Sequence, residues 1–190
     1  MSHRPLAALC LCLLAAPAAF AQPVAWKTVD APTFTVELPG AAEMKEGVEK
    51  TQAGDVKTTT WGLQTDAAFY AVSIADYPPG MMGAAVPSKV LEGARDGAMA
   101  NVNGTVEKDF SVFLDSGLPK KKYPGREFDG STTSGLKLAA RLFLVDDRLY
   151  QLISVSPKAT FNAADFKKFA DSFKLKAAAA PAGSGKRTKK

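Results

Sequence analysis

Residues 136–156 read LKLAARLFLVDDRLYQLISVS, and they define the centre of the expected fold. Apolar residues predict a strand over 136–145, and a hairpin through Asp146-Asp147 leads to a second strand over 148–156. The first strand is apolar on both faces, which is typical of a central strand. One face carries Leu136, Leu138, Ala140, Leu142 and Leu144, and the other carries Ala139, Phe143 and Val145.

Further strand patterns lie upstream of this hairpin. Residues 34–38 alternate between apolar and polar and stop at Pro39-Gly40, which predicts a strand followed by a turn. The run from Glu43 to Tyr77 contains three patterns that predict an antiparallel meander. These strands are expected at 43–51, 56–65 and 68–77, and two more are expected at 105–114 and 121–132.

Two helices complete the expected fold. Ser88 is a candidate N-cap for a helix that ends at Asn103-Gly104, with apolar residues at helical spacing. Gly93 and Gly97 lie four residues apart within it, and we expect them to allow close packing on a sheet. Asn162 is expected to cap a second helix whose apolar stripe contains Phe166, Phe169, Ala170 and Phe173. The sequence therefore predicts an α+β fold, with two helices packed on an antiparallel sheet of six or seven strands.

The first 21 residues have the layout of a secretory signal peptide. A short basic start precedes an apolar run from Leu6 to Ala16, and Ala19 and Ala21 frame an A-x-A cleavage site. The apolar run is too short to span a membrane as a helix. We expect cleavage near Ala21 and a periplasmic or secreted protein. Its single domain would span residues 22–176, followed by a disordered basic tail over 177–190.

Cleavage would also remove both cysteines and the single histidine. The mature chain would lack the commonest general base, the commonest nucleophile and the commonest transition-metal ligands. We expect no cofactor, no metal site and no enzyme activity. A hydrolase that uses two carboxylates is compatible with this composition, but the spacing of the acidic residues does not indicate one.

Charge is distributed unevenly along the chain. Residues 22–176 carry 19 basic and 19 acidic side chains, so the expected domain is neutral. A neutral domain argues against nucleic-acid binding, because phosphate contacts need clustered Lys and Arg. The tail carries Lys186, Arg187, Lys189 and Lys190. These cations could tether the protein to anionic lipid or polymer of the envelope, or could serve only as a solubilising end.

Four segments carry a family resemblance: 34–40 (FTVELPG), 124–128 (PGREF), 141–152 (RLFLVDDRLYQL) and 169–175 (FADSFKL). Together they resemble a group of small exported bacterial proteins of unknown function. The order of elements is similar to the PsbP-like fold, which a Ran-binding nuclear import factor shares. The resemblance covers about residues 33–176 and implies an accessory or binding protein rather than an enzyme.

Four side chains are candidates for ligand or partner binding. Arg126 and Arg141 each lie in an apolar strand, and together they could hold a carboxylate or phosphate. The alternative is that each arginine lies on an exposed face of the sheet, or pairs with Glu127, Asp129 or Asp76. Asp76 and Tyr77 end a strand just before the loop that begins at Pro78, a common place for binding groups.

The expected function is that of an exported, non-catalytic accessory protein that binds a protein or an envelope component. The alternative is a periplasmic carrier of a small, partly apolar or anionic ligand, held between the sheet and the helix that contains Gly93 and Gly97. We expect no membrane-spanning segment. The identity of the partner and the oligomeric state are left open by the sequence.

Overall fold

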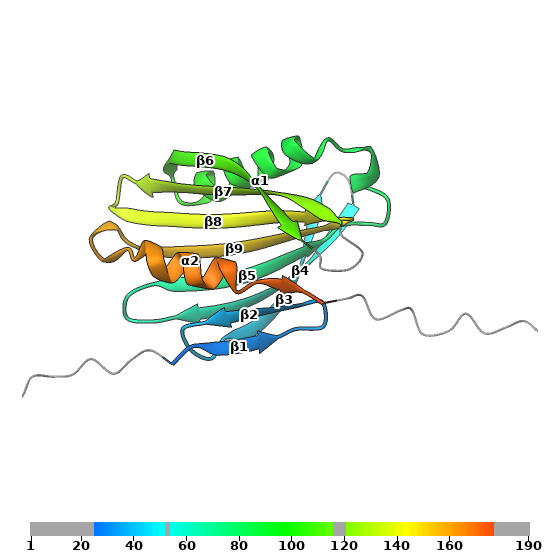
Figure 1. Ribbon diagram of the computed structural model, residues 1–190. Helices are drawn as coiled ribbons and strands as arrows, with labels where there is room; N and C mark the ends of the chain where they lie inside the picture. Colours follow the sequence, from blue (N-terminus) through cyan, green and yellow to red (C-terminus); the bar gives the residue numbers. More distant parts are fainter. Residues whose placement is uncertain (1–24, 52–53, 116–120, 177–190) are drawn as a thin grey trace, which may run out of the picture.

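The computed structural model describes residues 25–51, 54–115 and 121–176 (Figure 1). The expected signal peptide and the expected basic tail, with Lys186, Arg187, Lys189 and Lys190, lie outside these residues. The elements are β1 (Lys27–Asp30), β2 (Phe34–Leu38), β3 (Glu43–Thr51), β4 (Gly54–Gln64), β5 (Phe69–Asp76), η1 (Met82–Ala84), α1 (Pro87–Asn101), β6 (Gly104–Asp115), β7 (Lys122–Thr132), β8 (Leu136–Val145), β9 (Arg148–Pro157), η2 (Lys158–Thr160), α2 (Ala163–Asp171) and β10 (Lys174–Leu175).

Seven strands form one antiparallel sheet in the order β3-β4-β5-β9-β8-β7-β6. The meander β3-β4-β5 and the hairpin β8-β9 are both present, and the expectation of an α+β fold is confirmed. The hairpin turns at Asp146, whose φ of 52° lies in the left-handed region that tight turns require. Its strand β8 is flanked by β9 and β7, so the doubly apolar strand is an interior one.

A second, three-stranded sheet has the order β1-β2-β10 and was not expected. It joins the two ends of the described chain, because Lys174 and Leu175 pair with Thr35 and Phe34 of β2. Neither β1 nor β10, the two strands that pair with β2, shows a marked alternation of apolar and polar residues, and β10 is only two residues long. Pairing across about 140 residues is a tertiary event, and local sequence patterns do not reveal it.

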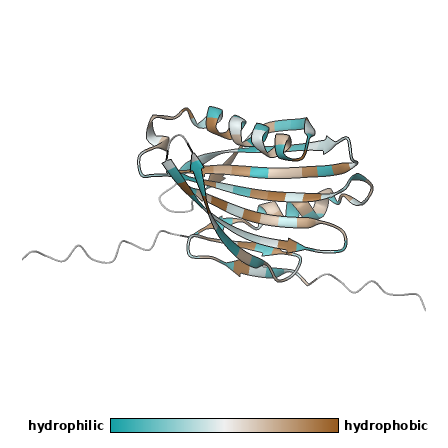
Figure 2. Ribbon diagram, turned by 180° about the vertical axis from the view of Figure 1, so that it is seen from behind, coloured by the Kyte–Doolittle hydropathy of each residue, from teal (hydrophilic) through white to brown (hydrophobic). Residues whose placement is uncertain are grey.

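The two helices lie on opposite faces of the seven-stranded sheet (Figures 1 and 2). On one face, α1 packs on β6, β7 and β8 through a core that contains Leu91, Met99 and Phe128. On the other face, α2 and the small sheet enclose a larger core that contains Phe34, Tyr150 and three Phe of the α2 region. Figure 2 shows many apolar residues along the central strands, as expected for strands that are covered on both faces.

Helix α1 differs from the expectation in two ways. It begins at Pro87, and the N-cap is Val86 without a side-chain hydrogen bond, so Ser88 is not the cap. Proline supplies this start instead, because its fixed φ suits the first helical turn. Gly93 and Gly97 are exposed, and an added Cβ would meet nothing within 4 Å at either position. The prediction that they pack on the sheet is wrong.

Close approach is provided by glycines of the sheet rather than by those of the helix. A Cβ on Gly104 or Gly130 would lie within about 2.5 Å of Cε of Met99, which enters this space from α1.

Helix α2 agrees with the expectation: Asn162 Oδ1 accepts hydrogen bonds from the backbone N–H of Ala164 and Asp165. Its apolar stripe is buried at Phe166, Phe169, Ala170 and, just beyond the helix, Phe173.

Candidate functional site

Arg126 and Arg141 do not share a site. Their strands β7 and β8 are neighbours, but Arg126 lies opposite Leu142 and Glu127 lies opposite Arg141 in the register. Residues that are directly opposite share a face, and successive residues alternate faces. Arg126 therefore lies on the α1 face and Arg141 on the α2 face, so the prediction of a joint cationic spot is wrong.

Arg126 is held by carboxylates of the protein itself. Its Nε and Nη2 donate to the two oxygens of Asp109 at 2.6 and 2.7 Å, and Glu92 of α1 lies 3.7 Å from Nη1. Arg95 of α1 donates to the same Asp109. The bidentate contact with Arg126, with Arg95 adding to it, holds the pKa of Asp109 below its usual range. This network fastens α1 to β6 and β7.

Arg141 is paired in the same way on the other face. Its Nε donates to Glu127, its cross-strand neighbour, and its Nη1 donates to Asp171 at the end of α2 at 2.8 Å. The contact with Glu127 is the ion pair that the sequence offered as the alternative. Only 15% of the Arg141 side chain is exposed, so the guanidinium is committed to positioning α2.

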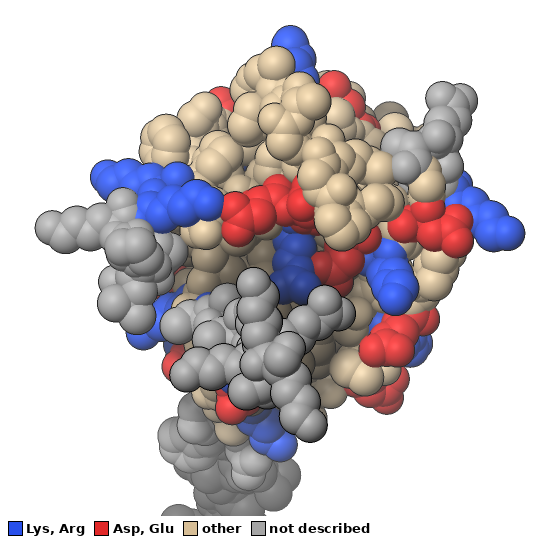
Figure 3. Space-filling view, turned by 90° about the vertical axis from the view of Figure 1, so that its right-hand side faces the viewer, with Lys and Arg blue, Asp and Glu red and all other residues tan. Residues whose placement is uncertain are grey.

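Asp76 and Tyr77 lie at the end of the molecule where β5 ends and β9 begins. Asp76 pairs with Arg148, its cross-strand partner. The backbone N–H of Tyr77 donates to Asp147 O at 2.9 Å, and burial, followed by the charge of Glu49, raises the pKa of its hydroxyl. Figure 3 looks onto this end and shows acidic and basic side chains interspersed. Among the described residues at this end, neither sign dominates and no patch of a single sign is visible.

The loop that follows Tyr77 is held by Asp147. Its two carboxylate oxygens accept hydrogen bonds from the backbone N–H of Gly80 at 2.8 Å and of Met82 at 3.0 Å. These bonds lower the pKa of Asp147. The second aspartate of the hairpin therefore fixes a loop that lies 65 residues away in sequence. The sequence predicted that both aspartates form the hairpin turn, but it did not indicate that Asp147 also holds this loop.

The structure reveals a different candidate surface, which we call the open face. It is the part of the α1 face where no helix lies over the sheet (Figure 2). In the register, two rows run from β3 through β4 and β5 to β9, and a third runs from β4 to β9. The open face consists of Glu43, Lys45, Thr60, Gly62, Gln64, Phe69, Ala71, Ser73, Gln151, Ile153 and Val155.

Polar and apolar groups are mixed on the open face. The hydroxyls of Thr60 and Ser73 hydrogen-bond to each other at 2.8 Å. Phe69 is 37% exposed, and its ring lies over Gly62, where an added Cβ would contact it at 3.4 Å. Glu43 and Lys45 form no ion pair within the described part of the chain. Such a surface offers donors, acceptors, both charges and one aromatic ring.

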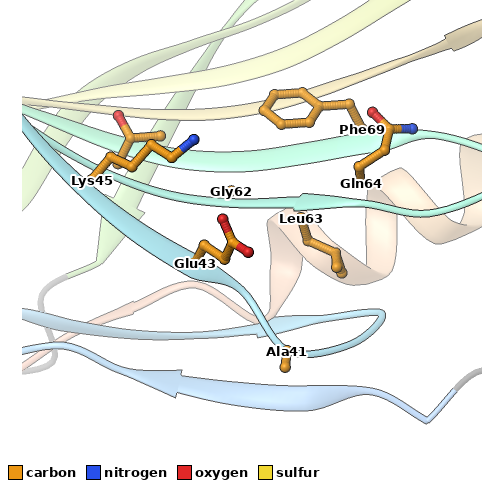
Figure 4. Close-up of a pocket in the computed structure, with 8 residues that line it drawn as sticks. Ala41, Glu43, Lys45, Gly62, Leu63, Gln64 and Phe69 are labelled. Carbon is orange, nitrogen blue, oxygen red and sulfur yellow. The ribbon is translucent and has the colours of Figure 1, made fainter.

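A hollow of about 350 Å³ lies at one edge of the open face (Figure 4). Strand β3 ends its pairing at Glu43, opposite Gly62, whereas β4 continues to Gln64. Leu63 and Gln64 of β4 therefore have no partner in β3. Leu63, Ala41 and Phe69 line the hollow at this point. Figure 4 shows Lys45 and Phe69 on one side of β4 and Leu63 on the other.

A signal for the open face was present in the sequence. β4 carries small and hydroxyl residues at alternate positions, whereas β8 carries apolar residues at the matching positions. The sequence of residues 56–65, which contains Thr58, Thr59 and Thr60, predicts a strand but does not indicate which of its faces is uncovered. Within residues 25–51, 54–115 and 121–176, no three His, Cys, Asp or Glu side chains group as a metal site, and no helix is long and apolar enough to cross a membrane.

Comparisons with known proteins add little to this geometry. No family model matches the chain, and no curated protein matches it. A solved structure described as a protein of unknown function, PA94 from Pseudomonas aeruginosa, a putative regulator, aligns with a TM-score of 0.38 and 9% identity. The alignment covers 64% of this chain and 86% of that one, and at this score it supports no inference. The resemblance to the PsbP-like fold stays a prediction.

Proposed function

We propose that this is an exported, non-catalytic accessory protein that binds a protein partner through its open face. The observation that carries the proposal is the unequal covering of one sheet face. Helix α1 covers β6, β7 and β8, while no helix lies over the half formed by β3, β4 and β5. Mixed polar and apolar surface with an aromatic residue is typical of protein interfaces.

The interior arrangement favours a partner over a ligand held beneath α1. Leu91 and Met99 are each 3% exposed and fill the space between α1 and the sheet. A Cβ added to Gly104 or Gly130 would lie about 2.5 Å from Cε of Met99, so the end of this side chain occupies the space beside both glycines. A carrier site between the sheet and α1 is therefore not supported, and the open face offers the better surface.

The test is to place a bulky cation in the middle of the open face. Thr60→Arg is expected to weaken capture of the partner by about tenfold, because a central, misfitting side chain disrupts an interface. The matched control is Thr28→Arg, at an exposed position of β1. Both variants, with a cross-linkable tag, are compared with wild type in the exported fraction, and thermal unfolding confirms that both fold. Equal capture by all three proteins would refute the open face as the interface.

A native mass spectrum of the exported protein separates the partner hypothesis from the carrier alternative. A co-purifying protein that Thr60→Arg removes supports the partner role. A discrete small-molecule adduct that persists in Thr60→Arg supports the carrier instead.

Export and tethering are also proposals. The signal-peptide layout supports cleavage after Ala21, so N-terminal sequencing of the exported protein is expected to begin at Gln22. Deletion of residues 177–190 is expected to reduce binding to anionic vesicles at low salt and to have no effect at high salt. Unchanged binding at low salt would leave the tail without a tethering role.

A further inference from the structure

A second hollow lies on the α2 side of the sheet, at the end of the molecule opposite to the one in Figure 3. It measures about 430 Å³, and its walls come from segments far apart in sequence. Figure 1 shows that the turn between β4 and β5 and the beginning of α2 meet at this end. Its chemistry rests on Trp26, Asp66, Tyr70 and Asp165. A hollow of this volume suits a small molecule.

Two carboxylates at this hollow have no cationic partner. Asp66 forms no hydrogen bond and no ion pair within the described part of the chain. Asp165 accepts a hydrogen bond from Asn162 Nδ2 at 2.8 Å, and no described lysine or arginine pairs with it. Several other carboxylates of the described residues are paired with a cation, as Asp109 is with Arg126, whereas Asp66 and Asp165 are not. The hollow therefore has an excess of negative charge.

An aromatic residue forms a fixed, neutral wall of the hollow. Tyr70 is 6% exposed, and its ring packs edge-on against Phe169 with 5.6 Å between centroids. Burial, followed by the negative charge of Asp165, raises the pKa of its hydroxyl, which therefore stays protonated. The negative charge of Asp165 therefore acts on Tyr70, a buried residue that lines the hollow.

Trp26 already has a cation over its ring. Lys168 Nζ lies 4.2 Å from the centroid of the indole, and this exposed lysine has no described ion-pair partner. An ammonium is attracted to the electron-rich face of an indole, and Trp is the best aromatic side chain for this contact. The Trp26 ring, which lines the hollow, therefore already contacts one ammonium group.

We propose that this hollow binds a small organic cation, a quaternary or alkyl ammonium group, against Trp26 and Tyr70 with Asp66 and Asp165 as countercharge. Lys168 competes for the indole face and must move aside for the ligand. The site lies on the other face of the sheet from the open face, so it does not depend on the proposed partner interface.

Choline chloride is a suitable first probe, with 3,3-dimethylbutan-1-ol as its uncharged isostere and sodium chloride as the ionic-strength control. The readout is the indole N–H signal of each tryptophan by NMR. Choline is expected to shift the Trp26 signal to saturation, while Trp61, which packs on Phe34 at 5.1 Å, serves as the internal control. Absence of saturation, or an equal shift by the neutral isostere or by sodium chloride, would overturn the proposal.

Variants then assign the contacts. Asp66→Asn and Asp165→Asn are each expected to weaken choline binding by about fivefold, the range of a partly exposed ion pair. Glu46→Gln removes an exposed carboxylate elsewhere and is expected to change nothing. Lys168→Met is expected to tighten binding, because it removes the competing cation. If neither Asp variant folds, weaker binding by Lys168→Met would still contradict the proposal.

Two sources of the ammonium can be distinguished by a second probe. A lysine blocked at its backbone ends presents a primary ammonium, as a partner protein would. Tighter binding of choline assigns the hollow to a free quaternary ammonium, and tighter binding of the blocked lysine assigns it to a side chain of a partner. Thr60→Arg is expected to leave both affinities unchanged.

Discussion

The α1 face of the seven-stranded sheet has two halves, one covered by the helix and one with no helix over it. Under α1, the β6–β8 half presents Phe128, Ala140 and Leu142, all nearly inaccessible to solvent. In the β3–β5 half, the same face presents Thr60, Gly62 and Ser73. Where no helix covers them, Thr60, Gly62 and Ser73 are small or polar. Val56 and Ala75 of the same strands still belong to the core on the α1 face, so the uncovered part is limited to the open face. Function is expected on the uncovered half.

The largest expected difference between the halves concerns two phenylalanines. Phe128 is 1% exposed beneath α1, whereas Phe69 is 37% exposed on the open face. Phe128→Ala is expected to lower the free energy of unfolding by about 3–5 kcal/mol, through lost burial and a cavity. Phe69→Ala is expected to cost less than about 1 kcal/mol. Urea unfolding of both variants measures this, and equal costs would mean that the open face is buried in solution.

A matched pair of glycines sharpens the comparison. A Cβ on Gly130 would lie 2.4 Å from both Thr105 O and Met99 Cε, and the backbone oxygen cannot move aside. Gly130→Ala is expected to destabilise the protein by about 1–3 kcal/mol through overpacking. Gly62→Ala meets only the Phe69 ring, at 3.4 Å, and is expected to be neutral or slightly stabilising. Thermal unfolding of the two variants should move in different directions or by clearly different amounts.

The solvent side of α1 offers a smaller effect of opposite sign. Gly93→Ala and Gly97→Ala each place a methyl group in open space, and each is expected to stabilise the protein by about 0.5–1 kcal/mol. The measurement is the urea midpoint of each single variant and of the pair. Destabilisation would mean that this side of α1 packs against something, as the sequence first indicated.

Acid is expected to have the smallest effect, and it acts on an ion pair between β6 and β8 that lies on the α2 face. Glu107 of β6 accepts a hydrogen bond from Lys137 at 2.7 Å, and this contact lowers its pKa from 4.5 to about 2. Because the folded-state pKa is depressed, the pair stabilises the protein above pH 4.5. That contribution is lost as the pH falls from 4.5 towards 2, since the unfolded chain takes up the proton first.

Glu107→Gln tests this pH dependence. Its stability is expected to fall below that of wild type at neutral pH and to converge with it as the pH approaches 2. Urea unfolding across this pH range measures the gap between the two proteins. A gap that stays constant with pH would show that the ion pair does not contribute to stability.

Most elements were predictable because their signals are local. The apolar pattern of β8 and β9, the Asp146 turn and the Asn162 cap depend on residues within a few positions of each other, and all were confirmed. The start of α1 was predicted two residues late, because a proline start needs no side-chain cap. The orientation of Gly93 was predicted wrongly, because a glycine in a helix does not reveal which side faces the sheet.

The candidate sites were less predictable than the elements. Alternation along β7 and β8 placed Arg126 and Glu127 on opposite faces, but it could not say which residues of β7 and β8 lie opposite each other. That register separates Arg126 from Arg141 and gives each its carboxylates. The hollow of Trp26 and Asp165 joins residues almost 140 positions apart, so no local pattern could indicate it.

The sequence by itself determined the antiparallel strands, the two helices, the interior position of β8 and the neutral charge of residues 22–176. These follow from periodicity and composition, which act over short distances. The tertiary structure decided the second sheet, the faces on which Arg126 and Arg141 lie, the extent of the open face and the convergence of Asp66, Tyr70 and Asp165. Those features depend on register and on pairing between distant segments, which only the packed chain defines.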